Sequence, residues 1–208
     1  MSHDPLRRDL YLRTLARLRR SLDHELRSHA GSVSLQLDLM SELVARGVAD
    51  GAKLEAPIQR AKTGLERLRK TAAAVVEATD VERGRNGADL GAVLRGIEGL
   101  LAPRARELGV TWAAVAPLEP VPLAGDGDAV REALTIAAVE SLEALPNGAR
   151  LTLAAAVDGG RAAVALEGAI ADSSSPTLAL VRAAIASAGG EAVAGDDGAP
   201  RFTLPLAT

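Results

Sequence analysis

Residues 15–44 read LARLRRSLDHELRSHAGSVSLQLDLMSELV, and this stretch decides the fold of the first part of the chain. Large apolar residues recur in it every three or four positions, which is the spacing of one face of an α-helix. No strand-like alternation interrupts the pattern, so we expect one very long helix. Its stripe consists of Leu15, Leu18, Leu22, Leu26, His29, Val33, Gln36 or Leu37, Met40, and Leu43 or Val44.

A second helix of the same kind follows a glycine-bounded turn at residues 47–51. Its stripe consists of Leu54, Ile58, Ala61, Leu65, Leu68, Ala72 and Val75. Two helices alone cannot enclose a core, so each stripe needs a further partner. Residues 5–82 are therefore predicted to form an antiparallel helical hairpin that pairs with a second copy in a dimeric four-helix bundle.

The pattern changes after residues 83–88, which contain Arg-Gly-Arg-Asn-Gly and are expected to be a linker. Residues 89–208 mix helical and strand patterns with turn signals, which is typical of an α/β two-layer sandwich. Helices are expected from an N-cap at Asp89 to Gly109, over 126–145, and from Pro176 to Gly189. Strands are expected at 110–115, 150–157, 161–167, 191–194 and 201–206, with a hairpin turn at 158–160.

Composition excludes several classes of function. Lys and Arg total 24 against 27 Asp and Glu, and only three residues are aromatic, which argues against a nucleic-acid partner. The absence of Cys rules out a disulfide scaffold and a thiolate zinc site, and the three His are too scattered for a metal site. No apolar run approaches the ~20 residues that cross a bilayer, and the N-terminus lacks the apolar core of a signal peptide. We expect a cytoplasmic protein without a membrane partner.

His24 is the candidate nucleophile. At 100° per residue it lies about 200° around the helix from Leu22, so it is expected to point to solvent. Arg27 and Ser28 share its face, as does Arg20. A neutral imidazole can accept a phosphoryl group, Glu25 could hold the required tautomer, and an arginine could balance the phosphoryl charge. From spacing alone, an ordinary surface histidine on a charged helix is the favoured interpretation.

His29 is expected to behave differently, because it sits within the apolar stripe between Leu26 and Val33. The simplest interpretation is a buried histidine in the seam, facing its mate in the dimer. A pH-sensitive bundle or a second phosphoryl acceptor are the functional alternatives.

The chain resembles bacterial sensor histidine kinases. DHELRS at 23–28 is similar to their phosphoacceptor box, usually His-Glu-Leu-Arg-Thr-Pro-Leu, and SVSLQLDLMSEL at 32–43 resembles the way that helix continues. Residues 89–112, 126–168 and 175–206 resemble, in order, the opening helix and strand, the central helix and hairpin, and the closing helix and strands of the kinase ATP-binding domain. The resemblance favours His24 as a phosphoryl site. It places Ser28 where kinase-phosphatases carry Thr or Asn, and His29 where the family has Pro.

The departures from that family concern its ATP motifs. Glu140 stands where the kinases use an Asn to hold the magnesium on ATP. Residues 167–171, Glu-Gly-Ala-Ile-Ala, replace Asp-x-Gly-x-Gly, and Ser175-Pro176-Thr177 replace a glycine-rich turn that approaches phosphates. The lid between these two motifs shrinks to residues 171–174. The resemblance thus implies a kinase body that has lost ATP binding and takes no cofactor.

Some phosphorelay phosphotransferases combine such a hairpin with a degenerate ATP-like domain. This likeness predicts a histidine phosphotransferase that shuttles a phosphoryl group between response-regulator aspartates and His24 without ATP. The partner receiver domain would supply any magnesium. Two alternatives stay open: a non-catalytic scaffold that binds a response regulator or another signalling protein, and a divergent active kinase.

Overall fold

The computed structural model describes residues 4–47, 50–79, 88–169, 175–195 and 199–207. The predicted linker at 83–88 and the predicted lid at 171–174 fall almost wholly outside these ranges. In chain order the described elements are α1 (Asp4–Ala45), α2 (Gly51–Thr79), α3 (Leu90–Leu108), β1 (Thr111–Val115), α4 (Gly127–Ala144), β2 (Arg150–Asp158), β3 (Arg161–Glu167), α5 (Pro176–Ser187), β4 (Glu191–Ala194) and β5 (Pro200–Pro205).

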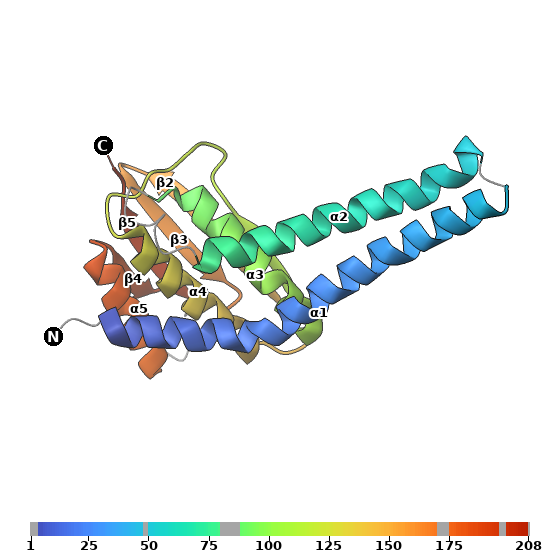
Figure 1. Cartoon of the computed structure of the whole chain (residues 1–208). Helices are drawn as coiled ribbons and strands as arrows, with labels where there is room; N and C mark the ends of the chain where they lie inside the picture. The colour runs from blue at the N-terminus through green and yellow to red at the C-terminus, as the bar shows by residue number, and fades with distance from the viewer. Residues whose placement is uncertain (1–3, 48–49, 80–87, 170–174, 196–198, 208) are drawn as a thin grey trace.

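The two long helices form the expected antiparallel hairpin, whose turn lies far from the rest of the molecule (Figure 1). α1 has 42 residues and α2 has 29, so the prediction of one very long first helix is confirmed. Asp50 caps α2 by accepting a hydrogen bond of 2.8 Å from the backbone N–H of Lys53. The helices approach closely at Gly64, where an added Cβ would lie 2.8 Å from Val33 Cγ2.

The second part of the chain is a sheet with helices α3, α4 and α5 on one face, so the predicted two-layer sandwich is confirmed. The strand order is β1-β2-β3-β5-β4, with β1 and β2 parallel and the other pairs antiparallel. Asp89 caps α3 through Ala92 N–H at 2.7 Å, and Gly109 ends that helix with φ of 65°. Each predicted strand and helix of this region matches an observed one within a few residues.

The first half of α1 does not project with the hairpin but lies along α4 in the helical layer (Figure 1). Tyr11 and Leu18 are fully buried there, and Leu22 is nearly so. The sequence predicted that Leu18 and Leu22 would face a second copy, and this was wrong, because their own chain covers them. The physical reason is that α3 and α4 both pack against α1, and residues 133–139 of α4, ALTIAAV, have almost no polar face and need cover on both sides.

Charged pairs secure the same contact. Glu132 of α4 is 1% exposed, and it accepts a hydrogen bond of 2.7 Å from Arg7 and another from Arg8. Further along α1, the Ser21 hydroxyl donates to Glu107 of α3 at 2.7 Å. A carboxylate as buried as Glu132 is tolerated only with such partners, so these bonds select one position of α1 on the sandwich.

The projecting part of the hairpin keeps a row of exposed large apolar side chains. Leu37 and Val44 on α1 are seven residues apart, as are Ile58 and Leu65 on α2, and their exposed fractions run from 37% to 61%. Seven-residue spacing places each pair on one side of its helix. Within the described residues, none of the helices is both long and apolar enough to span a bilayer.

Candidate functional site

His24 lies near the middle of α1, just beyond the segment that packs on the sandwich, and its side chain is exposed as predicted. Arg20, Arg27 and Ser28 are exposed too, so the face expected from helical spacing is available to a partner. Arg27 forms an ion pair with Asp23, with Nε 3.1 Å from Oδ1. This exposed i,i+4 pair contributes little stability, so Arg27 can exchange it for another anion.

Glu25 is directed away from His24. Its Oε1 lies 2.7 Å from His29 Nε2 and accepts a hydrogen bond of 2.6 Å from Arg106 Nη2 of α3. The structure therefore brings together Glu25, His29 and Arg106, whereas the sequence predicted that Glu25 would hold His24. For Glu25 to orient the His24 imidazole, these two contacts would have to break.

The expectation for His29 is corrected as well. Its side chain is 14% exposed, but it lines a groove between the hairpin and α3 together with Glu25 and Arg106. The i,i+4 spacing of Glu25 and His29 was a signal in the sequence for their contact. Arg106 had no such signal, because it lies 81 residues from Glu25 along the chain.

The position that aligns with the magnesium-binding Asn of the kinases is occupied by an ion pair. Glu140 accepts a hydrogen bond of 2.5 Å from Arg17 of α1, and Glu143, one turn further, is bonded to both Arg17 and Arg104. α1 therefore contacts α4 at the residue that the resemblance assigned to a metal. An arginine in place of a divalent cation satisfies the same carboxylate charge.

The stretch in place of the family's glycine motif has a structural role. Gly168 has φ of 85°, and a Cβ there would lie 2.2 Å from the carbonyl oxygen of Arg150. This glycine is thus required by the approach of β3 to β2. Pro176 starts α5 after Ser175, whose side chain makes no capping hydrogen bond. Residues 170–174 lie outside the described part of the chain.

Comparison with known proteins gives structural matches only. No protein-family model matches the chain, and no curated protein matches it in sequence. The catalytic domain of histidine kinase ThkA is 15% identical, with a TM-score of 0.50, and the match covers 58% of this chain and 95% of that one. Histidine kinase AdeS of Acinetobacter baumannii is 18% identical, with a TM-score of 0.48, and covers 88% of this chain and 97% of its own. A histidine kinase from Burkholderia phymatum is also 18% identical, with a TM-score of 0.46, covering 93% of this chain and 98% of that one.

The likeness to ThkA establishes the fold class. The α/β part of this chain has the fold of a histidine-kinase catalytic domain, which agrees with the resemblance found in the sequence. At 15% identity this likeness extends to the fold alone, and the chemistry has to be argued from the residues.

Proposed function

We propose that the protein is a dimeric histidine phosphotransferase of a two-component phosphorelay. In this proposal, His24 receives a phosphoryl group from the aspartate of one response-regulator receiver domain and transfers it to another. The observation that carries the proposal is an exposed His24 with Arg20 and Arg27 on its face, on a histidine-kinase-like chain whose α4 site is closed by Arg17. Magnesium, where the reaction needs it, comes with the receiver.

The chemistry requires little of this chain. A neutral imidazole nitrogen of His24 attacks the phosphorus of the aspartyl phosphate, so that an N–P bond forms and the P–O bond to the aspartate breaks. The aspartate leaves as a carboxylate, and the imidazole N–H proton passes to water. Reversal of these steps on a second receiver regenerates the imidazole. Because the acyl phosphate supplies the energy, ATP is not consumed, and Arg20 or Arg27 stabilises the phosphoryl oxygens.

The fixed position of the sandwich supports transfer without ATP. A kinase must bring a nucleotide held by its sandwich to the histidine on its hairpin. Here one helix, α1, packs on α4 through Tyr11 and Leu18 and then continues into the hairpin that carries His24. Movement of the sandwich relative to His24 would have to break that packing and expose Glu132, which is 1% exposed. Glu140 stands where the kinases use an Asn for magnesium, and its bond to Arg17 competes with a metal for the carboxylate.

The exposed apolar row on the projecting hairpin supports a homodimer. Leu37, Val44, Ile58 and Leu65 lie outside the core of the single chain. A second copy that packs the same row against this one would complete a four-helix bundle and remove the row from water. In this arrangement the dimer contact lies in the distal part of the hairpin, beyond the segment of α1 that packs on the sandwich.

A non-catalytic scaffold that binds a response regulator is the second candidate, and one observation favours it. Glu25, the residue expected to orient the His24 imidazole, has other contacts, since it is bonded to both His29 and Arg106. A scaffold would use the same exposed face of α1 to bind a receiver without accepting its phosphoryl group.

The deciding experiment is incubation of the full-length protein with candidate receivers that carry a labelled aspartyl phosphate. The phosphotransferase proposal expects label on the wild-type protein and none on His24→Ala, with the dimer intact in both. His29→Ala is the matched control on the same helix and is expected to accept label. Labelling of a folded His24→Ala protein but not of His29→Ala would place the acceptor at His29.

Two other outcomes separate the remaining candidates. Receiver binding without label on any variant would establish the scaffold. Label from Mg-ATP on His24 in the absence of a receiver would establish a divergent kinase.

A further inference from the structure

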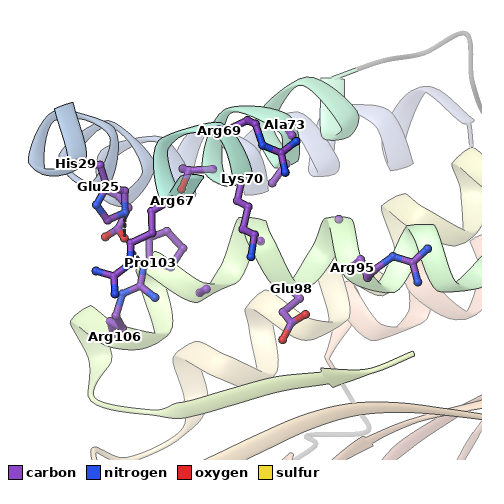
Figure 2. A pocket seen from close by; sticks show the side chains of 15 residues that line it. Glu25, His29, Arg67, Arg69, Lys70, Ala73, Arg95, Glu98, Pro103 and Arg106 are labelled. Carbon is purple, nitrogen blue, oxygen red and sulfur yellow. Dashed lines mark hydrogen bonds and ion pairs between the residues drawn. The ribbon is translucent and has the colours of Figure 1, made fainter. Parts of the chain in front are cut away.

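A groove of about 800 Å³ runs between the second half of α2 and α3, and Glu25 and His29 of α1 close one end of it (Figure 2). Its volume is in the range of sites that hold small molecules. The groove is separate from the exposed face of His24 and from the contact of α1 with α4.

The floor of the groove is built from small residues. Gly99 lies against α2 so closely that a Cβ there would be 2.7 Å from the Cβ of Ala74. Gly96 and Ala102 continue this small-residue face along α3. Because no large side chain rises from the floor, the space between the two helices stays open, and only the long side chains of the walls reach across it.

The walls are strongly basic. Five lining residues are cationic and two are carboxylates, in a chain whose net charge is −3. The cations are Arg67, Arg69, Lys70, Arg95 and Arg106, and the carboxylates are Glu25 and Glu98. Figure 2 shows Arg67 beside Arg106 at the end closed by α1, Lys70 extending from α2 toward α3, and Arg95 at the other end.

Not all of these cations are neutralised. Arg69 is bonded to Glu66 on its own helix, Arg106 is bonded to Glu25, and Arg95 lies 3.7 Å from Asp89. Among the described residues, neither Arg67 nor Lys70 has a carboxylate within ion-pair distance. Gathering like charges in a partly enclosed groove is unfavourable unless an anion enters it.

We infer that this groove binds a small ligand that carries linked phosphate groups. Arg67 and Lys70 are three residues apart on one face of α2, so both can reach a single ligand. Arg95 and Arg106 lie 11 positions apart on α3, which spans about 16 Å of helix and suits an extended anion better than a single phosphate. Arginine donates two parallel N–H···O hydrogen bonds to phosphate oxygens, and lysine contributes a compact positive charge beside them.

Such a ligand would connect α1, α2 and α3, which all contribute residues to the groove. It would contact α2 and α3 directly and would meet His29 of α1 at the closed end of the groove. Occupancy would therefore hold the hairpin against the sandwich at residues 25–29 of α1, directly after His24. The inference does not rest on phosphotransfer by His24, because binding at the groove is measured without any receiver.

The test is calorimetric titration of the full-length protein with inorganic triphosphate in metal-free buffer. We expect saturable binding with one site per chain. The double variant Arg67→Gln with Lys70→Gln removes two charges and keeps the side-chain length, and its affinity is expected to fall at least about tenfold. The matched control is Arg60→Gln with Lys62→Gln, two cations on α2 outside the groove, which should leave the affinity unchanged.

Three results would overturn the inference. The first is a titration in which triphosphate does not saturate the wild-type protein. The second is a loss of affinity in the control variant equal to that in the double variant, because this would indicate nonspecific attraction. Tighter binding of a glutamate-rich peptide than of triphosphate, lost in the same double variant, would identify an acidic protein segment as the occupant instead. A parallel titration with a nucleoside triphosphate shows whether an organic group attached to the phosphates increases the affinity. Circular dichroism verifies that each variant is folded.

Discussion

Tyr11 reports directly on the packing of α1 against the sandwich, because it is the only tyrosine in the chain and is fully buried at that contact. The pKa of the Tyr11 phenol is raised from 10.0 to about 12, chiefly because the side chain is buried; the charge of Arg131 opposes the rise, that of Glu132 adds to it, and that of Arg8 opposes it. A rise of about two pKa units corresponds to about 3 kcal/mol of preference for the neutral phenol.

The sign of the pH dependence follows from this shift. The pKa of Tyr11 is higher in the folded state, so its contribution to stability is complete below pH 10 and is lost as the pH rises from 10 toward 12. Tyrosinate absorbance during alkaline titration measures this pKa, with Tyr11→Phe as the blank. In the folded protein the absorbance should change near pH 12, and in denaturant near pH 10.

A substitution beside the tyrosine tests the packing itself. Leu18→Asp places a carboxylate at a fully buried position of the same contact, at a cost of several kcal/mol. We expect the first half of α1 to leave the sandwich and the pKa of Tyr11 to fall toward 10. Leu12→Asp is the control, because Leu12 is 52% exposed on the same helix. A wild-type Tyr11 that titrates near pH 10 while circular dichroism still shows a folded protein would refute the packing of α1 on α4.

Three further predictions address the dimer, the buried ion pair and one carboxyl group. Leu65→Asp should convert the dimer to a monomer in light scattering, because a charge replaces an exposed apolar residue of the proposed seam. A variant that remains dimeric would show that this row does not form the interface. Glu132→Ala should lower the free energy of unfolding by about 3–5 kcal/mol in urea titrations, since it removes the buried carboxylate to which Arg7 and Arg8 are both bonded. A loss below about 1 kcal/mol would contradict the buried pair. The Ser21 hydroxyl, with a smaller contribution from Arg104, holds the pKa of Glu107 below its usual value. Ser21→Ala should therefore raise the pKa of Glu107 in an NMR titration, and an unchanged pKa would argue against the hydrogen bond between Ser21 and Glu107.

Helix α1 links the two parts of the molecule. One continuous helix belongs to the core of the sandwich at its first half and to the hairpin at its second. Any partner that bends or displaces the hairpin therefore acts on the same helix that buries Tyr11 and Leu18. The groove between α2 and α3 lies at this junction, where a bound anion would oppose such a movement.

Local features of the sequence determined most of the secondary structure. Three- and four-residue spacing predicted both long helices, and the cap residues Asp89, Gly109 and Pro176 placed the ends of α3 and the start of α5. The exposure of His24 also followed from its angle to Leu22. These features could be predicted because helical periodicity and capping depend on residues within one or two turns of each other.

Only the tertiary structure decided what covers each apolar face and which charges meet. Periodicity identifies the apolar side of α1 but does not distinguish a second copy from the chain's own core. The burial of Leu18 within that core overturned the first expectation. Glu25 meets Arg106 across 81 residues, and Arg17 meets Glu140 across 123. Side-chain charge is known from the sequence, but its partner is set by the packing of whole helices, so pairs this distant have no local signal.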